Sequence, residues 1–169
     1  ELKTATSDFF LSKELKLENE SEALITGDAS LVLNQGLHLK AGEISSSYGR
    51  IELGAKGVQE GGKLSLKETM LALTDNFTKS GGYLTDETNT LKLLTDLSYT
   101  SNSFQQFREL LLDNHSLTLE TESSKLLVEK ALVLDHINEK IKSIGANISF
   151  FNELTVKAGK ITMIGGELI

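Results

Sequence analysis

The sequence predicts an all-β fold, a right-handed parallel β-helix (solenoid) built from rungs of about 20 residues. Three observations predict this fold. Apolar residues recur in columns about 20 residues apart, apolar and polar residues alternate within each rung, and the chain of 169 residues has no proline. Proline cannot donate a ladder hydrogen bond, so its absence suits a backbone that lies in β-ladders almost throughout.

The repeat consists of four apolar columns and one glycine column with the same step. A rung cannot bury its inner face alone, and stacking rungs about 4.8 Å apart buries the columns against one another. From the length and the step we expect about eight rungs. The columns are Leu31, Ile51, Leu71, Leu91 and Leu111; Leu33, Leu53, Leu73 and Leu93; Leu24, Ile44, Leu64, Leu84 and Phe104, resuming at Ile144 and Ile164; Leu17, Leu37, Phe77, Leu97, Leu117 and Ile137, interrupted by Gly57; and Gly42, Gly62 and Gly82.

Within each rung, apolar residues flank a single variable residue, which is the pattern of a short strand with one buried face. Segments rich in Gly, Ser, Thr, Asn, Asp and Lys separate these triplets and are expected to be turns. The predicted strands contain LKL (15–17), LVL (31–33), LHL (37–39), IEL (51–53), LSL (64–66), LAL (71–73), LKL (91–93), LTL (117–119) and LVL (132–134).

One phrase occurs twice, as LHLKAGEI (37–44) and as LTVKAGKI (154–161). We interpret both copies as the same corner of the rung. Gly42 and Gly159 would then lie where the chain needs a positive φ or where neighbouring backbones pass closely. The offset between the copies is short of a whole number of rungs, so the later rungs are expected to have lost residues.

The pattern weakens between Gly82 and Gly145, where no glycine occurs. We expect an irregular insertion around 101–143, with strands over 126–137 and room for a short helix in 104–112. A leucine-rich repeat is the alternative fold, but its asparagine column is reduced here to Asn34 and Asn114. Residues 1–169 are expected to form a single β-helix segment, internal to a longer chain.

Composition excludes several classes of partner and site. The net charge is −7 and the pI about 5.0, so we expect no nucleic-acid partner, because phosphate binding requires a basic stripe. The absence of cysteine excludes disulfides and thiolate metal sites. No apolar run approaches the roughly 20 residues of a membrane helix, and ELKTATSDFF at the start lacks the pattern of a signal peptide, so we expect no membrane insertion.

The residues give no sign of catalytic, cofactor-binding or metal-binding chemistry. His38, His115 and His136 fall in different columns, and alternation points His38 outward. No acid–base pair stands out, and Glu60 and Glu120 share a column with lysines, as on a mixed solvated face. The glycine-rich GAKGVQEGGK (54–63) lacks the ending of a phosphate-binding loop. We therefore expect no enzyme, no cofactor and no metal site.

The segments LVLNQGLHLKAGEI and NELTVKAGKITMIGGEL resemble the haemagglutinin repeats of filamentous haemagglutinin-type exoproteins, which leave the cell by two-partner secretion. The resemblance covers 15–100 and 144–168 well and 101–143 poorly. It implies a secreted rod at the bacterial cell surface, exported through an outer-membrane transporter partner. Such rods include adhesins and the stalks of contact-dependent growth-inhibition toxins, so a cell-surface receptor or glycan is an expected partner. Any binding surface is expected in 101–143, where the pattern is irregular.

Two other functions stay open on sequence alone. One is a β-helix enzyme or phage-type spike that acts on polysaccharide, which would require a groove with carboxylates on adjacent rungs. The other is an intracellular β-helix that forms filaments through uncapped ends.

Overall fold

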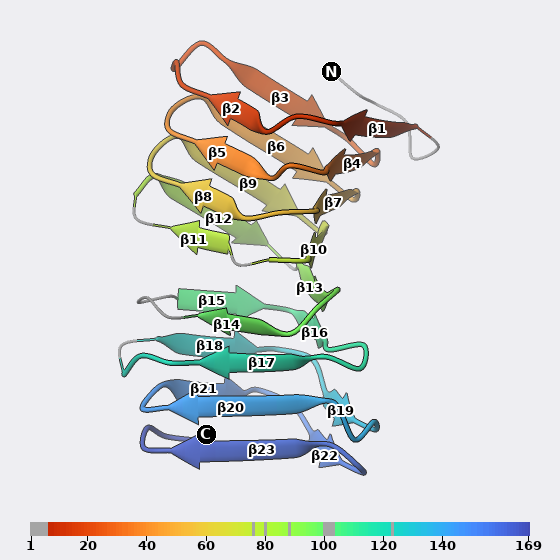
Figure 1. Cartoon of the computed structure of the whole chain (residues 1–169), viewed down its shortest axis with the longest axis vertical. Coiled ribbons are helices and arrows are strands. Elements are labelled where there is room, and N and C mark those ends of the chain that lie inside the picture. The colour runs from red at the N-terminus through yellow and green to blue at the C-terminus, as the bar shows by residue number, and fades with distance from the viewer. Residues whose placement is uncertain (1–6, 76, 80, 88, 100–103, 123) are drawn as a thin grey trace. The chain divides into compact units, whose positions relative to one another are not determined.

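A computed structural model describes residues 7–169, apart from residues 76, 80, 88, 100–103 and 123. The described chain is all-β and forms a parallel β-solenoid of about seven turns (Figure 1). The predicted fold class is confirmed, with about one turn fewer than expected. The turns contain three strands, unlike a leucine-rich repeat, whose unit has a single strand. No helix in the described part of the chain could span a membrane.

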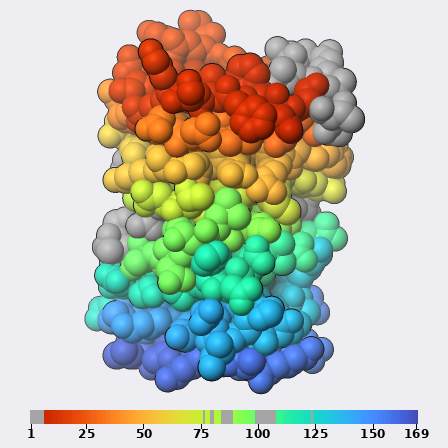
Figure 2. Space-filling view, turned by 45° about the vertical axis from the view of Figure 1, so that its right-hand side comes forward, coloured from red at the N-terminus to blue at the C-terminus, as the bar shows by residue number. Residues whose placement is uncertain are grey.

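The chain forms two compact units, unit 1 (Glu1–Thr90) and unit 2 (Leu91–Ile169). In each unit the colour of the surface changes in bands, because each turn lies on the turn before it (Figure 2). The strands of unit 1 form the parallel ladders β1-β4-β7-β10, β2-β5-β8-β11 and β3-β6-β9-β12. Their bounds are β1 Asp8–Leu11, β2 Leu15–Leu17, β3 Ala23–Thr26, β4 Ser30–Leu33, β5 Leu37–Leu39, β6 Glu43–Ser47, β7 Arg50–Leu53, β8 Gly57–Gln59, β9 Lys63–Lys67, β10 Met70–Leu73, β11 Phe77–Lys79 and β12 Tyr83–Glu87.

Unit 2 contains the parallel ladders β14-β17-β20-β23, β15-β18-β21 and β19-β22, and its strand β16 lies beside β13. Strand β13 begins at the last residue of unit 1. The bounds are β13 Thr90–Leu93, β14 Leu97–Tyr99, β15 Phe104–Phe107, β16 Glu109–Leu111, β17 Ser116–Leu119, β18 Lys125–Val128, β19 Leu132–Leu134, β20 Lys140–Ile144, β21 Asn147–Phe150, β22 Leu154–Val156 and β23 Lys160–Ile164.

Three apolar columns of unit 1 follow the predicted register. Leu33, Leu53 and Leu73 lie opposite one another on β4, β7 and β10, and all three are buried. Leu31, Ile51 and Leu71 form the parallel column on the same strands, and Leu24, Ile44, Leu64 and Leu84 align on β3, β6, β9 and β12. Full burial of one such side chain stabilises the fold by about 1.5–3 kcal/mol, so the inner columns hold the turns together.

The fourth column is correct in its centre and wrong at its start. Leu37, Gly57 and Phe77 align as predicted, whereas Leu17 lies opposite Leu39 rather than Leu37. The corner between β2 and β3 is longer than the later corners. Its extra residues form a turn in which the Glu22 N–H donates to the Asn19 carbonyl, and they shift the register by two.

The glycine column is confirmed. Gly42, Gly62 and Gly82 have φ values of +73°, +61° and +72°, a region that favours glycine. A Cβ atom at Gly82 would also lie 2.3 Å from the Gly61 carbonyl oxygen. Both the left-handed backbone and the close approach of successive corners therefore require glycine here.

The two copies of the repeated phrase do not form the same corner. Gly159 lies outside the left-handed region, and the glycines of unit 2 with positive φ are Gly145, Gly165 and Gly166. A Cβ atom at Gly159 would lie 2.4 Å from the Glu139 carbonyl oxygen. Close approach of two backbones therefore explains Gly159, whereas Gly42 also needs its positive φ.

The region 101–143 is more regular than predicted. Residues 104–107 and 109–111 form strands β15 and β16, so the helix considered for 104–112 is wrong, whereas the strands expected over 126–137 are present as β18 and β19. Residues 101–103 and 123 lie outside the described part. The irregularity lies in the step between turns, because Leu97 pairs with Leu117 but Ser116 pairs with Lys140.

This uneven step corrects the columns predicted for unit 2. Ile141, not Ile137, lies opposite Leu117, and Ile137 is 75% exposed. The loop between β19 and β20 holds additional residues, which carry Ile137 out of the ladder. Leu110 and Leu112 are buried on either side of Leu111, so the first column also shifts by one residue.

The third column does not resume in its own ladder. Ile144 and Ile164 lie opposite each other on β20 and β23, while Phe104 lies opposite Lys125 on β15 and β18. The buried, inward-facing residues of β18 and β21 are Leu126 and Ile148. An equal spacing in sequence therefore joins residues of different ladders once the step between turns varies.

Candidate functional site

An open groove of about 360 Å³ lies on unit 2, over the segment that the sequence singles out for binding. Residues of three successive turns contribute to it. Lys92 comes from β13, and the other residues come from β16, β19 and the loops that follow them. The lining is Lys92, Glu109, Leu110, Leu111, Leu112, Asp113, Ala131, Val133, Asp135, His136 and Glu139. All except Lys92 fall within 101–143.

The groove coincides with an interruption of the ladders. Strand β16 ends the sheet that contains β13, while β19 pairs with β22 in a separate two-stranded sheet. The loops after β16 and β19 are also irregular, and Asp113 and Asn114 adopt positive φ values of 49° and 70°. Strand edges that are not joined in one sheet leave backbone groups available to a ligand, and Val133 is exposed beside them.

Charge at the groove is dominated by an ion pair. Lys92 Nζ lies 2.9 Å from Asp113 Oδ2. The hydrogen bond from Lys92, followed by its positive charge, lowers the pKa of the Asp113 carboxyl, and the more distant His115 and His136 add to the effect. Asp113 therefore carries its negative charge over a wider pH range than an isolated aspartate.

Glu139 organises the loop at the end of the groove. It is buried, and its Oε2 accepts the N–H groups of Asp135 at 2.9 Å and His136 at 3.1 Å. Its Oε1 accepts the Asn114 N–H of the preceding turn at 3.4 Å. A carboxylate that accepts several backbone N–H groups fixes loop geometry. The sequence analysis missed this residue, although the DHINE segment, rich in polar residues and lacking glycine, marks a loop that needs a side-chain cap.

The histidines of unit 2 lie beside aspartates but form no metal centre. His115 Nδ1 is 3.8 Å from Asp96 Oδ1, and His136 Nε2 is 3.6 Å from Asp135 Oδ1. Among the described residues, no group of three or more His, Asp or Glu side chains could hold a metal ion.

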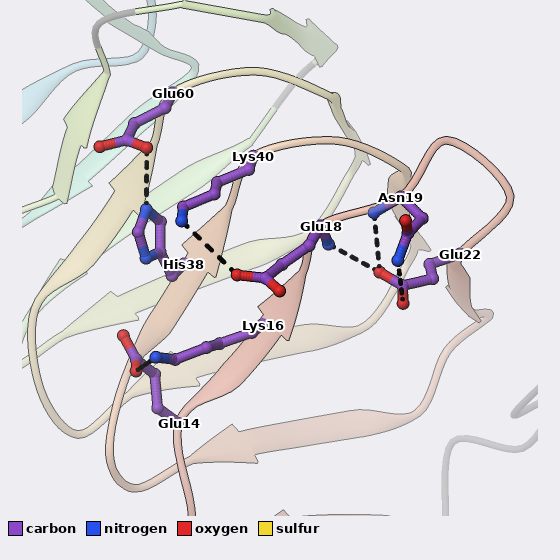
Figure 3. A network of polar contacts seen from close by, with 8 residues as sticks. All are labelled: Glu14, Lys16, Glu18, Asn19, Glu22, His38, Lys40 and Glu60. Atoms are coloured by element: carbon purple, nitrogen blue, oxygen red, sulfur yellow. Dashed lines mark hydrogen bonds and ion pairs between the residues drawn. The ribbon is translucent and has the colours of Figure 1, made fainter.

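A second polar surface covers β2, β5 and β8 of unit 1 (Figure 3). His38 points outward, as alternation predicts, and its Nε2 lies 3.0 Å from Glu60 Oε2 of the next turn. Lys40 pairs with Glu18 across turns at 3.5 Å, and Lys16 pairs with Glu14 at 3.0 Å. This arrangement agrees with the mixed, solvated face expected around Glu60, where ion pairs contribute little to stability.

Glu22 closes the corner at one end of this surface (Figure 3). Its carboxylate accepts the Asn19 side-chain amide at 3.1 Å and the N–H groups of Glu18 and Asn19 at 2.6 and 3.1 Å. The side-chain bond from Asn19, followed by the backbone bonds, lowers the pKa of Glu22. Glu22 thus stabilises the long corner that shifts the register between β2 and β5.

The carboxylates that the sequence leaves scattered are brought together only in the groove. Glu109 and Asp113 come from one turn, and Asp135 and Glu139 come from the next. Comparison with protein-family models, curated proteins and solved structures found no match for this chain.

Proposed function

We propose that this chain is a structural and adhesive β-helical segment of a large secreted bacterial exoprotein of the filamentous haemagglutinin type. The observation that carries the proposal is the parallel β-solenoid, whose turns repeat with a step near 20 residues in both units. Such a stack separates its two ends by a fixed rise per turn and presents its outer faces to partners. The proposed role is therefore to space out or to present a binding surface, without catalysis.

Secretion through an outer-membrane transporter partner is part of the proposal. Each turn contacts mainly its neighbours, so a solenoid can fold turn by turn as the chain emerges. Folding in this order needs no distant contact to form first. The segment would then lie at the cell surface or in the medium, within a longer chain.

The groove of unit 2 is the surface that we propose for a receptor or glycan. It combines exposed Val133 with charged groups from adjacent turns and with strand edges that belong to separate sheets. Pockets that bind ligands usually join an apolar surface to a few placed polar groups.

An antibody raised against the 169-residue chain tests the proposal. Immunoblots of fractionated source cells would give the size and location of the parent chain. We expect a very large chain at the cell surface or in the medium. A cytoplasmic chain near 18.4 kDa would overturn the proposal and favour a filament-forming β-helix instead.

The groove also favours one catalytic alternative, an enzyme that acts on polysaccharide. Carboxylates from adjacent turns line it, and paired carboxylates are what glycoside hydrolysis requires. The test is to incubate the chain with a panel of polysaccharides and to measure new reducing ends. Turnover that Asp113→Asn or Asp135→Asn abolishes would establish this alternative over the structural role.

A further inference from the structure

Positive charge is concentrated at one end of the sequence. Residues 140–169 hold four lysines and two glutamates, a net charge of +2, whereas the whole chain carries −7. A charge asymmetry of this kind indicates a segment with its own electrostatic partner. Three of these lysines, Lys140, Lys142 and Lys160, lie on β20 and β23 of unit 2.

The three lysines share the outer face of one ladder. Lys140 lies directly opposite Lys160, and Lys142 lies between Thr118 of β17 and Thr162 of β23. All three are exposed, and alternate residues of β20, including Ile141 and Ser143, are buried on the other face. We call Lys140, Lys142 and Lys160 the lysine face.

The lysine face lacks counterions among the described residues. Each lysine on the network of unit 1 has a carboxylate partner on its own or the next turn, as do Lys63, Lys92 and Lys130. None of the lysine-face residues forms such a pair with a described residue. Two like charges directly opposite each other on neighbouring strands are unfavourable, so this arrangement weakens the stack unless an anion lies across it.

The surroundings suit a ligand that carries hydroxyl groups as well as negative charge. The side chains of Ser116, Thr118 and Thr162 are half-buried on the same face and provide hydroxyl donors and acceptors. Ile164, 55% exposed, adds an apolar contact beside them. A sugar ring offers hydroxyl groups at its rim and C–H groups on its faces, so it matches both kinds of neighbour.

We propose that the lysine face binds an acidic polysaccharide, whose carboxylate or sulfate groups lie across Lys140, Lys142 and Lys160. A chain of sugars presents several anions in a row, so it can meet lysines on successive turns, which lie about 4.8 Å apart. The inference deepens the proposed adhesive function by naming a ligand class, and it rests on that function for its biological meaning. Its experiment measures binding rather than location, so the two proposals can fail separately.

The same observations fit other polyanions less well. An extended nucleic acid needs a longer basic stripe and usually aromatic side chains for stacking, whereas hydroxyl side chains flank the lysine face. Stable attachment to an anionic membrane takes a larger cluster of basic residues, of about four to eight. These partners are therefore the competing outcomes of the test.

Fluorescence anisotropy with the whole 169-residue chain tests the inference. The labelled probes are polygalacturonate, dextran sulfate and uncharged dextran of matched length. We expect the two acidic probes to bind in dilute salt, the uncharged probe not to bind, and binding to weaken steeply as salt is added. Single-stranded DNA and phosphatidylglycerol vesicles are measured in parallel.

Two triple variants separate the lysine face from net charge. Lys140→Gln, Lys142→Gln and Lys160→Gln together should weaken binding by about tenfold or more. The matched control, Lys16→Gln, Lys40→Gln and Lys63→Gln, removes three charges that are already paired in unit 1 and should change binding far less. Circular dichroism confirms that both variants fold.

Three results would overturn the inference. The acidic polysaccharides do not bind, or they bind equally well to the lysine-face variant, or both triple variants lose binding to the same extent. Binding to the vesicles or to DNA without binding to either acidic polysaccharide would also overturn it and would assign the lysine face to that other polyanion.

Discussion

The ring of Phe77 occupies the space that a side chain at Gly57 would need. The two residues lie opposite each other on β11 and β8, and a Cβ atom at residue 57 would lie 2.5 Å from Phe77 Cδ2 and 2.7 Å from Leu53 Cδ1. Gly57 has no positive φ. Packing rather than backbone conformation therefore explains why glycine interrupts an apolar column.

Gly57→Leu should destabilise unit 1, because the new side chain collides with Phe77 in a core that is already filled. Overpacking of this kind costs about 1–3 kcal/mol. Urea denaturation followed by circular dichroism measures the change. The double variant Gly57→Leu with Phe77→Ala should recover part of the loss. A single variant that is as stable as the original chain would show that the core can relax around the extra side chain.

Leu73→Lys should break the stack of turns around β10. Leu73 is 1% exposed on the inner face of β10, and loss of a buried leucine alone costs about 2–5 kcal/mol before the cost of burying a charge. Ile25→Lys, at an exposed position on β3, is the control and should change the unfolding midpoint little. Equal stability of the two variants would contradict the inward direction of the second column.

The carboxyl of Asp113 should titrate below the usual range of aspartate, because the hydrogen bond and charge of Lys92 lower its pKa. A lowered pKa in the folded state contributes stability above the unfolded pKa, and this contribution is lost as the pH falls below about 4. Carbon-13 NMR of the side-chain carboxyl measures the midpoint. Lys92→Met should raise it, and Lys130→Met, which removes the partner of Glu109, should not.

Glu139→Ala should loosen the loops at the end of the groove. The substitution leaves the N–H groups of Asp135 and His136 without their acceptor, and each unsatisfied buried group costs about 1–3 kcal/mol. Hydrogen exchange should accelerate at these two amides. Glu139→Gln keeps one carbonyl oxygen and should have a smaller effect. Unchanged exchange in the alanine variant would mean that Glu139 does not organise the loop.

Lys160→Gln should raise the stability of unit 2 when no polyanion is present. It removes the repulsion between Lys160 and Lys140, which lie opposite each other on β23 and β20, and cross-strand pairs of this kind are worth about 0.2–1 kcal/mol. The gain, measured as a shift in thermal midpoint, should shrink as salt is added. Lys157→Gln, at an exposed corner, is the control. A lower midpoint for Lys160→Gln would mean that Lys160 makes a favourable contact.

The sequence by itself determined the architecture. Alternation along each strand and the step near 20 residues fix which side chains face inward, because a slip of one residue would turn every leucine of a strand outward. Leu33, Leu53 and Leu73 therefore align as their spacing predicts, and Gly42, Gly62 and Gly82 mark corners that need a positive φ.

Only the tertiary structure decided the register of unit 2 and the contents of its groove. Spacing cannot locate an extra residue when the loops vary in length, so it assigns Ile137 to a ladder that contains Ile141. Contacts between successive turns depend on that register. For this reason the capping role of Glu139 and the opposed pair of Lys140 and Lys160 became visible only when the turns were stacked.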